Sequence, residues 1–232
     1  MARVINRNAT AKADEGGSFI STSGIYQTHL KCVEIEYKAS GAMFANYFFT
    51  NGMSYSNLLK DKSGKDAYGF NQLDSLGIIE DLESYSIGQD ELEEYEMAFK
   101  NSTKTMMVIP EFTDIDVVVF VQYTYEMYDK DKGNGPEIQE RVAVKRFYRP
   151  SDNASSTEIV DETTVGVRFA SDTEKYASTV IYKETDAEAV ATWKEAQKSG
   201  TIAPVANGGA AKAAGFGSGA ARKGFGQPSQ NQ

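Results

Sequence analysis

Residues 24–60 read GIYQTHLKCVEIEYKASGAMFANYFFTNGMSYSNLLK, and this stretch decides the fold class of the chain. It contains three β-prone runs, separated by Ser40-Gly41 and Asn51-Gly52: 24–37, 42–50 and 53–60. An Asn-Gly dipeptide between apolar runs is a strong signal for a β-hairpin. The stretch therefore predicts three consecutive antiparallel strands.

The apolar residues of the first run change side partway along it. They fall into two sets of opposite parity: Tyr26, Leu30 and Cys32, then Val33, Ile35 and Tyr37. Successive side chains of a strand point to opposite faces. A β-bulge or a strongly curved strand would bring both sets to one core.

The next segments indicate a change of period followed by more strands. In 69–79 the apolar residues are three apart, which favours a short helix. Residues 90–100 resemble a second, acidic helix. Three β-prone runs follow, with a Gly-rich hairpin loop at 129–136 between the last two: 105–109, 115–128 and 138–149. Three strands, a helical connection and a long hairpin are the order of a five-stranded OB-fold barrel, although a β-sandwich stays open.

The ends of the chain differ from this mainly β domain of residues 24–150. Residues 1–23 are predicted to be a flexible arm, and 151–184 an extension or linker with short strands. Residues 185–199 form a predicted helix, in which Thr185 and Glu188 fit a capping box. Residues 200–232 are rich in Gly and Ala and are predicted to be disordered.

Composition excludes several classes of protein. The chain has 232 residues, 41 % of them hydrophobic, which is enough for a core. One cysteine (Cys32) and one histidine (His29) exclude a disulfide framework and a Cys-based zinc site, and we find no catalytic constellation around either. No apolar run reaches the length of a membrane span. We therefore expect a soluble cytoplasmic protein that is not an enzyme and needs no cofactor.

The charge is distributed unevenly along the chain. The formal net charge is −9, which at first argues against nucleic-acid binding. The segment 200–232 contains Lys212, Arg222 and Lys223 and no acid, so it carries +3 and leaves −12 for the remainder. Global charge is therefore a weak objection to a local basic site.

Two segments combine cations with aromatic rings. Residues 141–149 contain four basic residues and no acid, and strand parity places Arg141, Lys145, Phe147 and Arg149 on one face. A second cluster surrounds the turn at Gly64. Cations that follow phosphates and rings that stack on bases are what single-stranded nucleic acid requires. The candidate contacts are Tyr47, Phe49, Tyr55, Tyr123 and Phe147 for bases, and Lys60, Lys62, Lys65, Arg141, Lys145, Arg146 and Arg149 for phosphates.

A set of short motifs covers about half of the chain: Gly24-Ile25-Tyr26 with Leu30 and Glu34, Gly41, Asn46-Tyr47-Phe48-Phe49, Lys60 to Lys65, Gly69 to Leu73, Leu76-Gly77-Ile78, and the hairpin 115–149. In these motifs the chain resembles a phage family of single-stranded-DNA-binding proteins with OB folds. The resemblance implies a non-catalytic protein that coats single-stranded DNA during phage replication, recombination or repair, in the host cytoplasm. It also implies recruitment of replication or recombination proteins through the C-terminal tail, although this tail lacks the family's acidic tip.

Two alternatives stay open. The acidic rows at 80–83 and 91–96 would suit a structural or adaptor protein, or a DNA mimic that binds a basic protein. RNA is the variant ligand of the first hypothesis. The sequence leaves open whether the protein forms a homo-oligomer.

Overall fold

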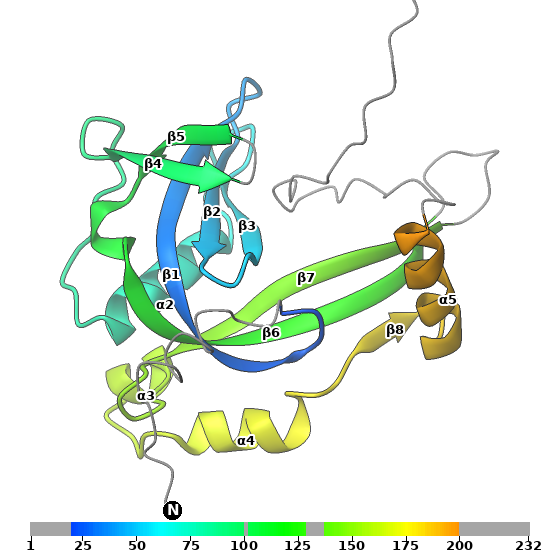
Figure 1. Ribbon diagram of the computed structural model, residues 1–232. Helices are drawn as coiled ribbons and strands as arrows, with labels where there is room; N and C mark the ends of the chain where they lie inside the picture. The colour runs from blue at the N-terminus through cyan, green and yellow to red at the C-terminus, as the bar shows by residue number, and fades with distance from the viewer. Residues whose placement is uncertain (1–19, 100–101, 129–136, 200–232) are drawn as a thin grey trace, which may run out of the picture.

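The computed structural model describes residues 20–99, 102–128 and 137–199. It is mainly β, with an open, largely antiparallel sheet of eight strands and a few helices (Figure 1). The strands are β1 (Gly24–Tyr37), β2 (Met43–Phe49), β3 (Ser54–Lys60), β4 (Glu93–Phe99), β5 (Ser102–Val108), β6 (Ile115–Tyr128), β7 (Glu137–Tyr148) and β8 (Ile181–Lys183). The helices are α2 (Gly69–Ile79), η1 (Pro110–Phe112), α3 (Ser156–Val160), α4 (Val167–Lys175) and α5 (Ala187–Lys198).

Strand β1 is the curved strand that the change of parity predicted. Its first half pairs with β6, from Gly24 opposite Val121 to Leu30 opposite Ile115. Its second half pairs with β2, and the register shifts between Leu30 and Cys32. The bulge is confirmed. It lets Leu30 and Val33, which have opposite parity, both lie fully buried in the same core.

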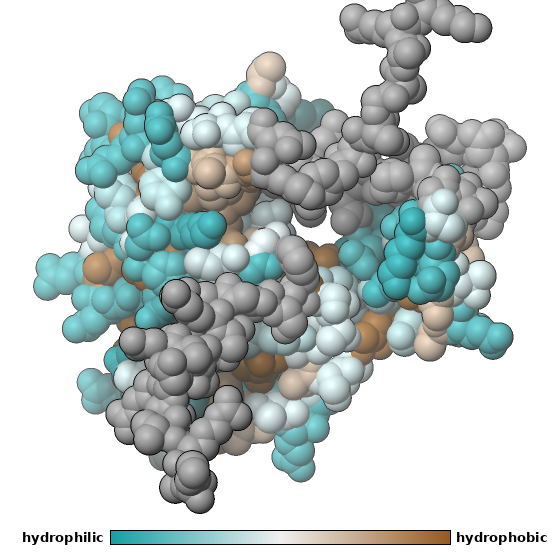
Figure 2. Space-filling model, viewed as in Figure 1, coloured by the Kyte–Doolittle hydropathy of each residue, from teal (hydrophilic) through white to brown (hydrophobic). Residues whose placement is uncertain are grey.

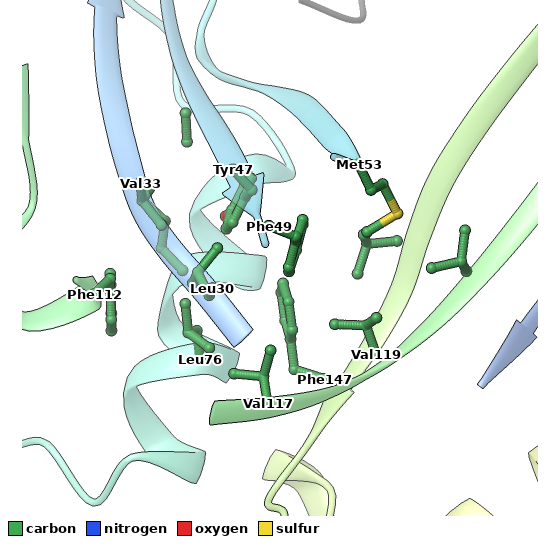
Figure 3. Packing of buried hydrophobic residues seen from close by; sticks show 14 of the residues in the cluster. Leu30, Val33, Tyr47, Phe49, Met53, Leu76, Phe112, Val117, Val119 and Phe147 are labelled. Atoms are coloured by element: carbon green, nitrogen blue, oxygen red, sulfur yellow. The ribbon is translucent and has the colours of Figure 1, made fainter. Parts of the chain in front are cut away.

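The main core lies between the strands and α2. Figure 3 shows side chains from β1, β2, β6, β7 and α2 pointing toward one another there, with Leu76 on the helix. A Cβ atom on Gly69 would lie only 2.3 Å from the carbonyl oxygen of Leu58. Only glycine therefore allows the first turn of α2 to approach β3 this closely. The helix predicted at 69–79 is confirmed.

A buried glutamine connects β3 to β7, which share no backbone ladder among the described residues. The Gln72 side chain of α2 accepts a hydrogen bond from Asn57 Nδ2 at 2.7 Å. Its Nε2 donates to the carbonyl oxygen of Val144 at 2.6 Å. A helix side chain thus joins the two strands where the sheet stays open.

The segment 90–100 is a strand where we predicted a helix. Strand β4 pairs antiparallel with β5, from Glu93 opposite Val108 to Phe99 opposite Ser102. Side chains alternate between the two faces of β4, and Met97 is buried in a second apolar cluster with Phe48 and Cys32. The spacing of the glutamates in this segment is compatible with a helix as well as with a strand. The burial of Met97 on one face of the strand favours the strand. Burial also raises the pKa of the Cys32 thiol to about 12.

The extension at 151–184 packs on the sheet and contains two helices that were not predicted, as well as the short strand β8. Helix α4 contacts β6 and β7 through Phe169, which packs against the cluster of Val118, Phe120 and Tyr148. Its Asp172 accepts hydrogen bonds from Arg146 and from the Tyr148 hydroxyl. The ring of Phe169 lies edge-on to Tyr148, with centroids 5.3 Å apart.

Two predictions near the ends of the described chain need correction. Helix α5 is confirmed, but Asp186, which accepts from the Ala189 amide at 2.8 Å, is its N-cap in place of Thr185. The predicted arm 1–23 is packed from residue 20, because Ile20 is buried and its carbonyl accepts from the Tyr123 hydroxyl. The rest of the arm, the 129–136 loop and the 200–232 tail lie outside the described residues. No described helix is long and apolar enough to cross a membrane.

Substitution of Gln72 by Leu should lower the free energy of unfolding by about 2 kcal/mol, because it leaves the Val144 carbonyl without a partner in the interior. Urea unfolding followed by circular dichroism measures the change. The control is Asn71→Leu at the exposed neighbouring position, which should change stability by less than about 0.5 kcal/mol. Equal effects of the two substitutions would show that the hydrogen bonds of Gln72 do not stabilise the connection between β3 and β7.

Candidate nucleic-acid interface

Four of the five aromatic residues proposed to stack on bases belong to the core. The exposed fractions of Tyr47, Phe49, Tyr123 and Phe147 are 0, 3, 5 and 1 %. Figure 3 shows three of them pointing into the protein. A ring without an exposed face cannot stack on a base, so this part of the prediction is wrong. Tyr55 is half-buried, 5.8 Å from the Tyr47 ring, and burial raises its pKa to about 12.

The basic row predicted on β7 does not form. The register between β6 and β7 shifts so that Phe120 lies opposite Arg146 while Val121 lies opposite Val144. Lys145 is the extra residue of this bulge, and it reverses the parity of the residues after it. Phe147 therefore faces the core, away from the exposed side of Arg141.

Three of the four cations of residues 141–149 are paired within the chain. Their ion pairs are Arg141 with Glu126 at 3.5 Å, Arg146 with Asp172, and Arg149 with Asp152 at 2.7 Å. The hydrogen bond from Arg149 lowers the pKa of the Asp152 carboxyl. Lys145 is exposed and has no ion pair among the described residues. The pairs of Arg146 and Arg149 hold the extension and its first turn, whereas that of Arg141 joins β7 to β6.

The turn at 61–65 presents Lys62 and Lys65 to solvent. The Asp61 carboxylate accepts hydrogen bonds from the Ser63 and Lys65 amides, and the bonds from Ser63 and Lys65 lower its pKa. Lys62 and Lys65 are exposed and have no ion pair in the described part of the chain. Lys60 Nζ lies 4.0 Å from Asp66. It also lies 5.9 Å from the centre of the Phe70 ring.

The β1–β2 turn lies beside this lysine turn. A Cβ atom built on Gly41 would lie 3.6 Å from the carbonyl oxygen of Lys62. Lys38 flanks the same turn, and its Nζ lies 5.9 Å from the centre of the Phe44 ring. Cations therefore gather at one end of β1, β2 and β3, and two of them lie over aromatic rings.

Two rings on the other face of β2 were not among the predicted contacts. Phe44 and Phe48 alternate with the core residues Tyr47 and Phe49, so they point to the opposite side of the sheet. Phe48 meets Phe99 of β4 edge-on, with centroids 6.3 Å apart. In Figure 2 brown atoms gather over the region where Figure 1 draws β4 and β2. Alternation revealed both sets of rings, but only the position of the core decides which set faces outward.

We call this side of β1, β2 and β3, together with the β4–β5 hairpin and the two turns, the outer face. Its aromatic and cationic side chains are Phe44, Phe48, Tyr95, Phe99, Lys38, Lys62, Lys65 and Lys104. Lys60 lies opposite the core residue Met43 and therefore points to the other side of the sheet, toward Phe70 of α2. Phe44, Tyr95 and Phe99 are half-buried, whereas Phe48 is 8 % exposed. Three rings therefore keep part of their surface available to a ligand.

A polar network crosses the middle of the outer face. The buried Glu34 carboxylate accepts from Lys104 Nζ at 2.6 Å and from Asn46 Nδ2 at 3.0 Å. Asn46 Oδ1 in turn accepts from the Ser56 hydroxyl at 2.7 Å. Burial opposes ionisation of Glu36, but hydrogen bonds from Lys38 and Asn46 lower its pKa overall. The network fastens the β4–β5 hairpin to β1.

The single histidine of the chain lies beside carboxylates. His29 lies between two exposed aspartates, with Nδ1 2.9 Å from Asp116 and Nε2 3.4 Å from Asp114. Over the described ranges, no group of three or more His, Cys, Asp or Glu side chains could hold a metal ion.

Comparison with known proteins found no matching family model, no matching curated protein and no matching solved structure.

Substitution of Lys104 by Met should lower the free energy of unfolding by about 1–2 kcal/mol, because Glu34 stays buried with one partner fewer. The loss is smaller than for a fully buried pair because half of the Lys104 side chain is exposed. Chemical unfolding measures it, with Lys175→Met on α4 as the control. A stability change no larger than the control's would show that the pair does not hold the hairpin.

Proposed function

We propose that this protein binds single-stranded DNA on the outer face, without strong sequence preference. The observation that carries the proposal is the pairing of cations with rings on one exposed end of the sheet. On the outer face Lys38 lies over Phe44, beside the exposed Lys62 and Lys65. At the same end of the sheet, Lys60 lies over Phe70 on the α2 side. Ring faces stack on any base and neighbouring cations bind phosphates, so this combination suits a flexible single strand.

The proposal includes an OB-type fold in which β1, β2, β3, β6 and β7 are the five barrel strands. Three features support it: the curved β1 paired with both β2 and β6, helix α2 after the third strand, and the Gln72 bridge from β3 to β7. The β4–β5 hairpin is then an insertion. In OB folds the face of the second and third strands and the adjoining loops bind oligonucleotides.

The acidic net charge is compatible with this ligand. Lys38 and Lys60 already pair with Glu36 and Asp66, so a phosphate would compete with these carboxylates. Lys62 and Lys65 need no such exchange. Each phosphate contact on a single strand contributes about −0.7 to the slope of log affinity against log salt concentration. We therefore expect a moderate salt dependence from a small set of contacts.

In this proposal the protein coats and protects exposed single strands during phage DNA replication, recombination or repair. It does so without catalysis. The support is the family resemblance of residues 24–79 and 115–149 together with the outer face. Competition between matched DNA and RNA oligomers distinguishes the two nucleic acids, because only RNA offers a 2′-hydroxyl group.

The double substitution Phe44→Ala with Phe99→Ala should weaken binding to a labelled dT oligomer by about 30-fold or more, at about 1 kcal/mol or more per stacked base. Fluorescence anisotropy measures the affinity. The control Tyr176→Ala removes a ring that is 49 % exposed after the end of α4 and should leave affinity unchanged. If the double variant binds with the affinity of the wild type, DNA does not stack on these two rings of the outer face.

Charge reversal tests the lysine turn separately. Lys62→Glu with Lys65→Glu should weaken binding and reduce the salt slope by about 1.4. The matched control Lys175→Glu with Lys183→Glu makes the same change of net charge on α4 and β8. If both pairs weaken binding equally, only the overall charge matters. Absence of binding by the wild-type chain at low salt would refute the proposed function.

One observation favours the alternative of an acidic adaptor protein. Glu93, Glu94 and Glu96 are exposed on β4, which lies at one end of the strand order β3-β2-β1-β5-β4. A basic extended segment of a partner would complement this strand in both charge and backbone hydrogen bonds. An adaptor of this kind would bind a basic protein and would have no affinity for oligonucleotides. The titration with the labelled dT oligomer therefore separates the two proposed functions.

A further inference from the structure

Helix α5 carries a hollow that plays no part in the proposed DNA interface. Its volume is about 520 Å³, and it is lined by Asp186, Glu188, Ala189, Thr192, Trp193 and Ala196. Sites for small ligands commonly have volumes of about 300–1,000 Å³. The lining combines a tryptophan and two alanines with two acids at the start of the helix. This chemistry suits a short peptide that carries an apolar side chain and positive charge.

Trp193 connects the hollow to the core. Its ring packs edge-on against Tyr125 of β6, with centroids 6.3 Å apart. Its Nε1 atom is buried and has no hydrogen-bond partner in the described part of the chain. An unpaired buried donor costs about 1–3 kcal/mol. A peptide carbonyl brought to the hollow would offer this donor an acceptor after a small movement of the ring.

The charges around the hollow favour a cation. Glu188 is exposed and has no ion pair within the described ranges. The lysines of the same helix are engaged elsewhere, because Lys194 lies 3.8 Å from Glu140 and Lys198 lies 2.8 Å from Glu195. Figure 2 shows hydrophilic side chains over the part of the surface where Figure 1 draws α5.

The C-terminal tail has the complementary chemistry. Residues 200–232 begin directly after α5, contain three cations and no acid, and carry two aromatic residues, Phe216 and Phe225, each between two glycines. The twelve residues of α5 extend about 18 Å. The seventeen residues from 200 to Phe216 can extend about 55 Å, which is ample to reach back along the helix. Because the tail is covalently joined to α5, its effective concentration at the helix is in the mM range.

We propose that the tail docks in the α5 hollow of its own chain. Phe216 or Phe225 packs against Trp193 and the two alanines, and the flanking glycines let the backbone approach the helix closely. Arg222 and Lys223 lie near Glu188. Docking covers the apolar lining of α5 and gives the basic tail a defined partner. It is independent of DNA binding at the outer face.

Trp193 is the only tryptophan of the chain, so its fluorescence reports directly on the hollow. In the full chain, Phe216→Ala with Phe225→Ala should shift Trp193 emission to longer wavelength and increase quenching by acrylamide. The control Ile202→Ala with Val205→Ala removes two other apolar side chains from the tail and should change neither property. If the phenylalanine variant matches the wild type, or if the control shows the same shift, the proposal is wrong.

A charge exchange tests the polar contact. Glu188→Lys alone, and Arg222→Glu with Lys223→Glu alone, should each produce the same red shift, whereas the combined variant should restore wild-type emission. Failure of the combination to restore it would overturn the role of Glu188. A shift that depends on protein concentration, with a dimer in analytical ultracentrifugation, would mean that the tail reaches a second copy, and would overturn docking within one chain.

Discussion

The pairing of β1 with two different partners is the constraint on which the rest of the structure depends. One half of this strand belongs with β6 and the other with β2, and the bulge after Leu30 lets the strand turn from one to the other. Without that turn, Leu30 and Val33 would lie on opposite faces and the core would split. The curvature also brings β3 toward β7, where the Gln72 side chain supplies the connection that the backbones do not make.

The core then determines what is left for the surface. Once Tyr47 and Phe49 fill the space against α2 and β7, Phe44 and Phe48 must face the other way. The β4–β5 hairpin covers part of that side and adds Phe99 to it. The outer face is therefore a by-product of core packing, in which polar and aromatic groups alternate beside a buried glutamate.

Charge has two distinct roles in this acidic protein. The arginines of residues 141–149 pair with Glu126, Asp172 and Asp152, and two of these pairs hold the 151–184 extension. The lysines of the turn around Gly64 serve no comparable structural role. A guanidinium makes several directed hydrogen bonds and suits a fixed pair, whereas a lysine on a turn remains available to a mobile anion. The distribution of charge, and not its total, bears on ligand binding.

The sequence by itself determined much of the local structure: the strands at 24–60, the bulge in the first of them, the helix at 69–79 and the long hairpin that follows. These features depend on alternation, turn residues and helical spacing, which act between neighbours in the chain. The strand at 93–99, the reversal of parity at Lys145 and the ion pairs of the arginines depended on the tertiary structure. Whether a residue faces the core or the solvent depends on strands distant in sequence, and one extra residue in a ladder reverses the answer for every residue after it.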